Sequence, residues 1–119
     1  MYGGGDPADE AKKYRPLLRY VHIKDINAPV LEEARSKRFN FEQAIGAGVF
    51  SPIGRGCIDF PGFFRCIAES GYSGWAIVEQ DVIYGKTAVP PAESMRASLD
   101  YLKNVLSGLE SRADASVPA

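Results

Sequence analysis

Two residues of this chain have the type and position to do chemistry, His22 and Glu79. Each comes near the polar end of a short apolar run, and His22 is the only histidine. A neutral imidazole and a carboxylate are good ligands for a divalent metal, and a carboxylate can also move a proton at a carbon next to a carbonyl. Two ligands do not complete a metal site. The residues alone therefore leave open a hydrogen-bonded histidine and a solvated carboxylate.

The apolar runs that carry these residues, Leu17–Asp25 and Gly74–Asp81, are predicted to be strands. Side chains alternate along a strand, so His22 shares a face with Lys24. Both faces of each run are mostly apolar, which is typical of parallel strands covered on both sides. Functional groups gather at the carboxyl ends of such strands. His22 and Glu79 are expected to converge if the strands are neighbours.

The other side chains of the two runs have structural interpretations. The aromatic residues Tyr20 and Trp75 are more typical of a core than of a ligand platform. The polar residues at the strand ends, Lys24, Gln80 and Asp81, are more typical of a surface than of a substrate site.

Capping residues and apolar periodicity predict helices around these strands. The expected helices cover residues 7–14, 29–38, 41–45, 60–70 and 92–106. In the last of them, the residues expected to face the core are Met95, Leu99, Leu102 and Leu106. The order of elements is an α/β pattern with two strands over residues 1–107, and residues 108–119 are expected to form a disordered tail.

Two parallel strands cannot cover their own outer edges. The pattern therefore predicts that this chain is the end of a larger layered structure, or that its exposed strand edges pair with another copy. A separate feature is the loop over residues 49–59, which contains Gly54 and Gly56. A Gly-x-Gly sequence can cradle an anion, but a turn that needs positive φ is the favoured interpretation.

Composition excludes several classes of function. The chain has 119 residues, 45% of them hydrophobic, with a formal net charge of −1 and scattered basic residues. This composition predicts one globular unit that binds neither nucleic acid nor an anionic membrane. No apolar run is long enough to span a membrane and no signal peptide is recognisable, so a cytosolic location is expected. Cys57 and Cys66 lack metal-type spacing and are expected to be reduced thiols.

Three sequence motifs occur together and in order. They are Val21-His22-Ile23-Lys24-Asp25, then Gly54-Arg55-Gly56 with Ile58-Asp59-Phe60, and finally Gly71-Tyr72-Ser73-Gly74-Trp75. This series resembles the carboxyl-terminal third of the sugar isomerase/epimerase superfamily, which has the xylose isomerase-like TIM barrel. The longer insert at Gly48–Pro52 and the ending Glu79-Gln80-Asp81 are most similar to the inosose dehydratases of that superfamily.

The resemblance implies a fold and a metal site. The two strands would be the seventh and eighth of a (β/α)₈ barrel, the last two with their helices. Enzymes of the family bind a divalent ion, typically Mn²⁺ or Co²⁺, through two glutamates, an aspartate and a histidine. By this resemblance His22 is a metal ligand, Glu79 is a metal ligand and the catalytic proton carrier, and Lys24 is a possible substrate contact. The remaining ligands would come from earlier strands that this sequence does not contain.

The implied reaction is loss of water from a keto-inositol through an enediolate, catalysed by a lyase. Little or no activity is expected from this chain alone. A sugar or hydroxypyruvate isomerase of the same superfamily would share the metal and the enediolate. A non-catalytic binding or assembly module, in which strand edges pair with another chain, is the alternative from a different class.

Overall fold

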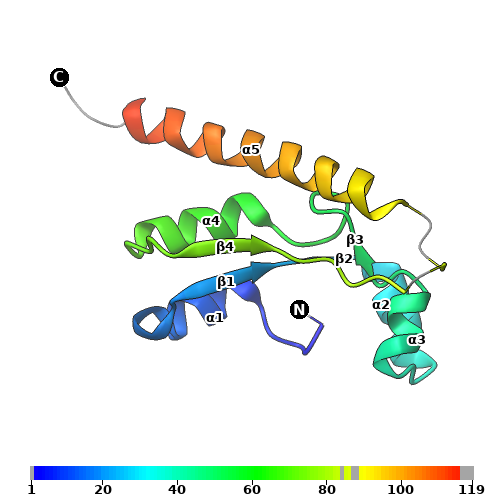
Figure 1. Cartoon of the computed structure of the whole chain (residues 1–119). Helices are drawn as coiled ribbons and strands as arrows, with labels where there is room; N and C mark the ends of the chain where they lie inside the picture. Colours follow the sequence, from blue (N-terminus) through cyan, green and yellow to red (C-terminus); the bar gives the residue numbers. More distant parts are fainter. Residues whose placement is uncertain (1, 84, 87–88, 116–119) are drawn as a thin grey trace.

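A computed structural model describes residues 2–83, 85–86 and 89–115 of the chain (Figure 1). The helices are α1 Pro7–Lys13, α2 Ala28–Ser36, α3 Phe41–Gly46, α4 Phe60–Glu69 and α5 Pro91–Ala115, with a 3₁₀ turn at Arg15–Leu17. The strands are β1 Tyr20–Ile23, β2 Asp25–Ile26, β3 Phe50–Ser51 and β4 Trp75–Val78. Within the described residues, none of these helices combines the length and the apolar character needed to cross a bilayer.

Side-chain caps start the first four helices near the predicted positions. Asp6, Asn27, Asn40 and Asp59 each accept a hydrogen bond from a backbone amide of the first turn. Around Asn40 the capping box is complete, because the Gln43 side chain also accepts from the Asn40 amide. These caps satisfy amides that a helix leaves without internal partners, which explains why the helix starts could be predicted.

The last helix differs from its prediction in length. α5 continues to Ala115, so the expected end at Gly108 and the expected disorder of residues 108–115 are wrong; residues 116–119 lie outside the described part. A glycine inside a helix costs about 1 kcal/mol relative to alanine. Here Val105 and Leu109 pack against the hydrophobic core on either side of Gly108, and this packing favours continuation of the helix.

The buried face of α5 also differs from its prediction. Leu99 and Leu106 are exposed, whereas Ser94, Ser98 and Leu102 are buried. The Ser98 hydroxyl accepts a hydrogen bond from the Ile53 amide at 3.0 Å and donates one to the Ser94 carbonyl at 2.8 Å. A hydroxyl that satisfies a loop amide therefore lies on the inner face, and the leucine pattern alone could not indicate it.

The strands β1 and β4 are parallel neighbours, as predicted. His22 lies opposite Ile77 and Ile23 opposite Val78. The Glu79 amide continues the pairing by donating to the Ile23 carbonyl at 3.0 Å. Beyond this sheet, β2 and β3 form a second, antiparallel pair. β3 lies in the segment expected to be a loop, and β2 begins at Asp25, where the first predicted strand run ends.

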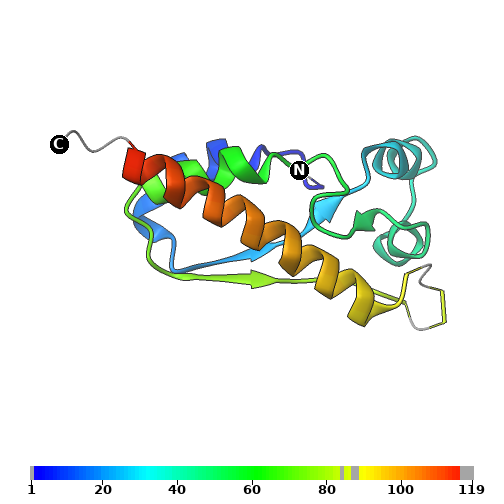
Figure 2. The ribbon, with the colours of Figure 1, turned by 90° about the horizontal axis from the view of Figure 1, so that it is seen from above.

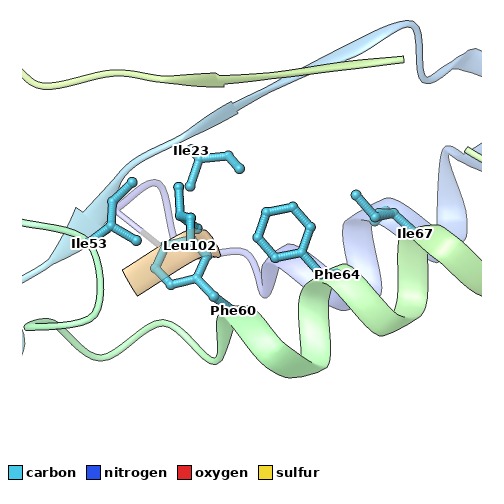
Figure 3. Close-up of a cluster of buried hydrophobic side chains, with 7 residues drawn as sticks. Ile23, Ile53, Phe60, Phe64, Ile67 and Leu102 are labelled. Atoms are coloured by element: carbon cyan, nitrogen blue, oxygen red, sulfur yellow. The ribbon is translucent and has the colours of Figure 1, made fainter. Parts of the chain in front are cut away.

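One face of the β1–β4 sheet carries the main core. Figures 1 and 2 show α1 and α4 covering this face, with α5 running beside α4 and β4. In Figure 3 the side chains of Phe64 and Ile67 extend from α4 toward the strands, and Ile23 of β1 is buried in the same cluster. The described chain provides no layer for the other face of the sheet.

The uncovered face overturns one prediction. Trp75 is 80% exposed and Tyr20 is 61% exposed, although both were expected in the core. The period-2 pattern correctly indicates strands with two apolar faces, but this chain supplies helices for only one of them. In a closed (β/α)₈ barrel the opposite face of each strand points into the barrel interior, which other strands complete.

The Gly-x-Gly loop folds around a carboxylate of the chain itself. Asp25 is fully buried, and its two oxygens accept hydrogen bonds from the amides of Gly54 at 2.9 Å, Gly56 at 2.9 Å and Ile58 at 3.1 Å. They also accept one from the adjacent Ile26 amide at 2.8 Å. Gly54 adopts φ +86, so the favoured interpretation, a turn with positive φ, is confirmed. The cradle for an anion also exists, and Asp25 occupies it.

Tyr101 of α5 packs over this loop and gives a pH-dependent prediction. Burial, then the nearby charges of Asp25 and Asp59, raise the pKa of its phenol. A raised pKa in the folded protein means that stability is complete below the unfolded pKa of about 10 and falls as the pH rises through the folded pKa. Tyr101→Phe keeps the ring but removes the titrating hydroxyl. We therefore expect this variant to lose less stability than the wild type when the pH rises above about 10.

The measurement is urea unfolding of both proteins at neutral and at strongly alkaline pH. Tyr14→Phe, which changes an exposed tyrosine, is the matched control. Equal alkaline losses of stability in the wild type and Tyr101→Phe would contradict the prediction.

Candidate active site

The carboxyl ends of β1 and β4 bring His22 and Glu79 together, as the sequence predicted. His22 Nδ1 and Glu79 Oε2 lie 2.6 Å apart. The two side chains are 49% and 38% exposed, so a ligand can reach them. They belong to the sheet face that the helices leave open, because alternation directs His22 away from the buried Ile23.

Lys24 joins the same cluster. Its ammonium donates to Glu79 Oε1 at 2.9 Å and to Asp81 Oδ2 at 2.5 Å, and it lies 4.6 Å from the centre of the Phe50 ring. An ammonium has three N–H donors. Two of them are used in these hydrogen bonds within the described residues.

The Lys24 contacts shift two pKa values in opposite directions. Burial lowers the pKa of Lys24, but the hydrogen bonds and charges of Asp81 and Glu79 outweigh it, and the net pKa is raised. The pKa of Glu79 is lowered by the hydrogen bond from Lys24 and then by that from His22, against a smaller effect of burial. At neutral pH Glu79 is therefore ionised, with the charge needed to accept a proton or to hold a cation.

His22 and Glu79 could provide part of a metal site. An imidazole nitrogen and a carboxylate 2.6 Å apart at an accessible sheet edge are suitable donors for a divalent ion. Among the described residues no group of three or more His, Cys, Asp or Glu side chains could hold a metal. The Asp81 carboxylate lies nearby but is paired with Lys24. A complete coordination sphere would need further ligands beyond the side chains of the described residues.

Asp81 and Gln80, which were predicted to be typical surface residues, both form specific side-chain hydrogen bonds. Asp81 holds Lys24, and the Gln80 Oε1 accepts a hydrogen bond at 2.5 Å from the hydroxyl of the buried Ser94. The alternation of the strand already placed Asp81 on the Glu79 face, which was a usable signal. No sequence signal indicated the contact between Gln80 and Ser94, because it joins the end of the strand to α5 across a loop.

Sequence comparison identifies the class of protein. The family described as xylose isomerase-like TIM barrel matches residues 1–105. The chain belongs to this family, and its two parallel strands with their helices are part of such a barrel, which the described residues do not close.

Within this family, the chain is similar to individual proteins named inosose dehydratase. The chain is 41% identical over 81 residues to the inosose dehydratase of Geobacillus kaustophilus and 37% identical over 81 residues to that of Clostridium beijerinckii. These matches cover 68% of this chain but only 26% and 27% of the relatives. The chain therefore spans about a quarter of the length of the curated relatives it matches. No solved structure gives a significant match.

Proposed function

We propose that this chain contributes His22 and Glu79 to the metal-dependent active site of a lyase that removes water from a keto-inositol. The observation that carries the proposal is the contact between these side chains at the carboxyl ends of adjacent parallel strands. In (β/α)₈ enzymes the active site lies at this end of the barrel. Similarity to inosose dehydratases supports the substrate class.

The chain's own residues have distinct roles in the proposed reaction. His22 and Glu79, together with ligands from elsewhere, would hold a divalent metal, Mn²⁺ or Co²⁺, which would supply Lewis-acid stabilisation of negative charge on the ketone oxygen. Glu79 is the proton carrier. Its carboxylate accepts a proton from the carbon next to the ketone and then donates that proton to the hydroxyl of the neighbouring carbon, which leaves as water. Lys24 keeps Glu79 ionised and offers its third N–H to a substrate hydroxyl.

The test of the metal site uses a chimera, in which this chain replaces the matching part of the Geobacillus kaustophilus relative. The chimera is expected to bind Mn²⁺ in isothermal titration calorimetry, and His22→Ala to weaken the binding by at least about 100-fold, more than loss of an outer-shell partner. Cys57→Ala, which removes another exposed potential ligand, is the control. Equal binding by the wild-type and His22→Ala chimeras would overturn the assignment.

The exposed aromatic face favours a second candidate, assembly through the sheet. Trp75 and Tyr20 together present an apolar surface beside open strand edges. If the chain alone forms a concentration-dependent oligomer that ignores a chelator, and the chimera binds no metal, assembly replaces catalysis as the function.

A further inference from the structure

A pocket of about 320 Å³ lies next to the candidate active site. It is bounded by the end of α3, by β3 and by the segment after β4, which runs toward α3 in Figure 1. Its volume is near the lower end of the roughly 300–1,000 Å³ range of ligand pockets. Asp81 lines the pocket and is joined to Glu79 through the Lys24 ammonium. A ligand in the pocket would therefore adjoin the reacting groups.

Two polar side chains of the pocket have unused hydrogen-bonding capacity. The Ser51 hydroxyl is buried and has no hydrogen-bond partner within the described part of the chain. A buried hydroxyl without a hydrogen-bond partner is unfavourable, and a hydrogen bond to a ligand hydroxyl would remove this cost. Gln80 uses its Oε1 to accept from Ser94, so its two amide N–H groups remain as donors. Because Ser94 is fully buried, it fixes the orientation of this amide.

The rest of the lining is mostly neutral. Ile45, Val82 and Ile83 provide apolar surface, and the charge of Asp81 is paired with Lys24. Lys86 lies on the exposed rim. An apolar wall facing a few hydroxyl-binding groups suits a ring whose faces carry C–H bonds and whose edge carries hydroxyls. It suits a phosphorylated sugar less well, because the lining offers an anion only one exposed lysine.

We propose that this pocket binds the hydroxylated ring of a neutral cyclic polyol, with Ser51 and Gln80 contacting hydroxyls away from the reacting carbons. This inference rests on the proposed function, because the pocket adjoins Glu79, the proposed proton carrier. It adds a site for substrate specificity to that function. Ser51 and Gln80 are then binding residues, and Ser94 is a positioning residue that acts through Gln80.

The test is an NMR titration of the full ¹⁵N-labelled chain with myo-inositol, without metal. We expect shift changes at the amides of Gly48, Ser51 and Val82, which line the pocket. Ser51→Ala and Gln80→Leu should each weaken binding roughly five- to tenfold, the effect of one hydrogen bond. Ser36→Ala removes a hydroxyl that bonds within α2 and should leave the affinity unchanged.

Three results would overturn the proposal. They are no shifts at saturating myo-inositol, shifts that persist with equal affinity in both pocket variants, and tighter binding of glucose 6-phosphate than of myo-inositol. Failure of the proposed function can be distinguished from failure of this inference. The proposed function is tested by Mn²⁺ binding to the chimera through His22, whereas the titration with myo-inositol contains no metal. Polyol binding with unchanged Mn²⁺ affinity in His22→Ala would leave the pocket standing and remove the metal site.

Discussion

Replacing Asp25 by alanine is expected to lower the free energy of unfolding by about 4 kcal/mol or more, a large part of the stability of a small domain. The carboxylate satisfies the amides of Ile26, Gly54, Gly56 and Ile58 while fully buried. Alanine would leave these donors without an acceptor, and each buried unsatisfied group costs about 1–3 kcal/mol. Asp25→Asn should also destabilise, because its amide nitrogen would face N–H groups.

Urea unfolding measures this effect, with Asp59→Ala as the matched control. Asp59 accepts a single amide, from Gly62, at the start of α4, and loss of such a cap costs about 1 kcal/mol. Asp25→Ala must therefore be clearly more destabilising than Asp59→Ala. Equal losses of stability would mean that the loop does not depend on the buried carboxylate.

Glu79→Gln in the chimera is expected to reduce kcat for dehydration by about 10²- to 10⁴-fold, the usual contribution of a positioned acid or base. Glutamine keeps the size of the side chain but cannot carry the proton, and it lacks the charge that Lys24 and His22 contact. The loss should appear in kcat rather than only in KM, since the proton moves in the transition state.

Glu69→Gln is the control for this substitution. Glu69 is exposed on α4, away from the sheet end that carries Glu79, and its change should leave kcat unaffected. A Glu79→Gln chimera that keeps wild-type kcat would remove Glu79 from the chemistry.

Much of the fold could be predicted because its signals are local. Helix caps lie within three residues of the amides they satisfy, and strand alternation has a fixed period. The same alternation indicated that His22 and Glu79 would meet once the strands paired, and they do so at 2.6 Å. Family membership confirms the resemblance that the motifs carried.

The missed features depend on contacts that no local pattern contains. Asp25 finds amide partners about thirty residues away, in the loop that carries Gly54 and Gly56. The burial of Ser98 depends on an amide of Ile53 on another segment. The exposure of Trp75 could not be predicted either. In a (β/α)₈ barrel one face of each strand lines the barrel interior, and the described residues do not close that barrel.

The most direct test of the central claim is the mass of the product that the folded chimera forms from a keto-inositol in the presence of Mn²⁺. We expect a product lighter by one water, and we expect Glu79→Gln to abolish its formation. A product of unchanged mass would identify an isomerase, which shares the metal chemistry but keeps every oxygen. A folded, metal-loaded chimera that forms no product would contradict the assignment of His22 and Glu79 to an active site.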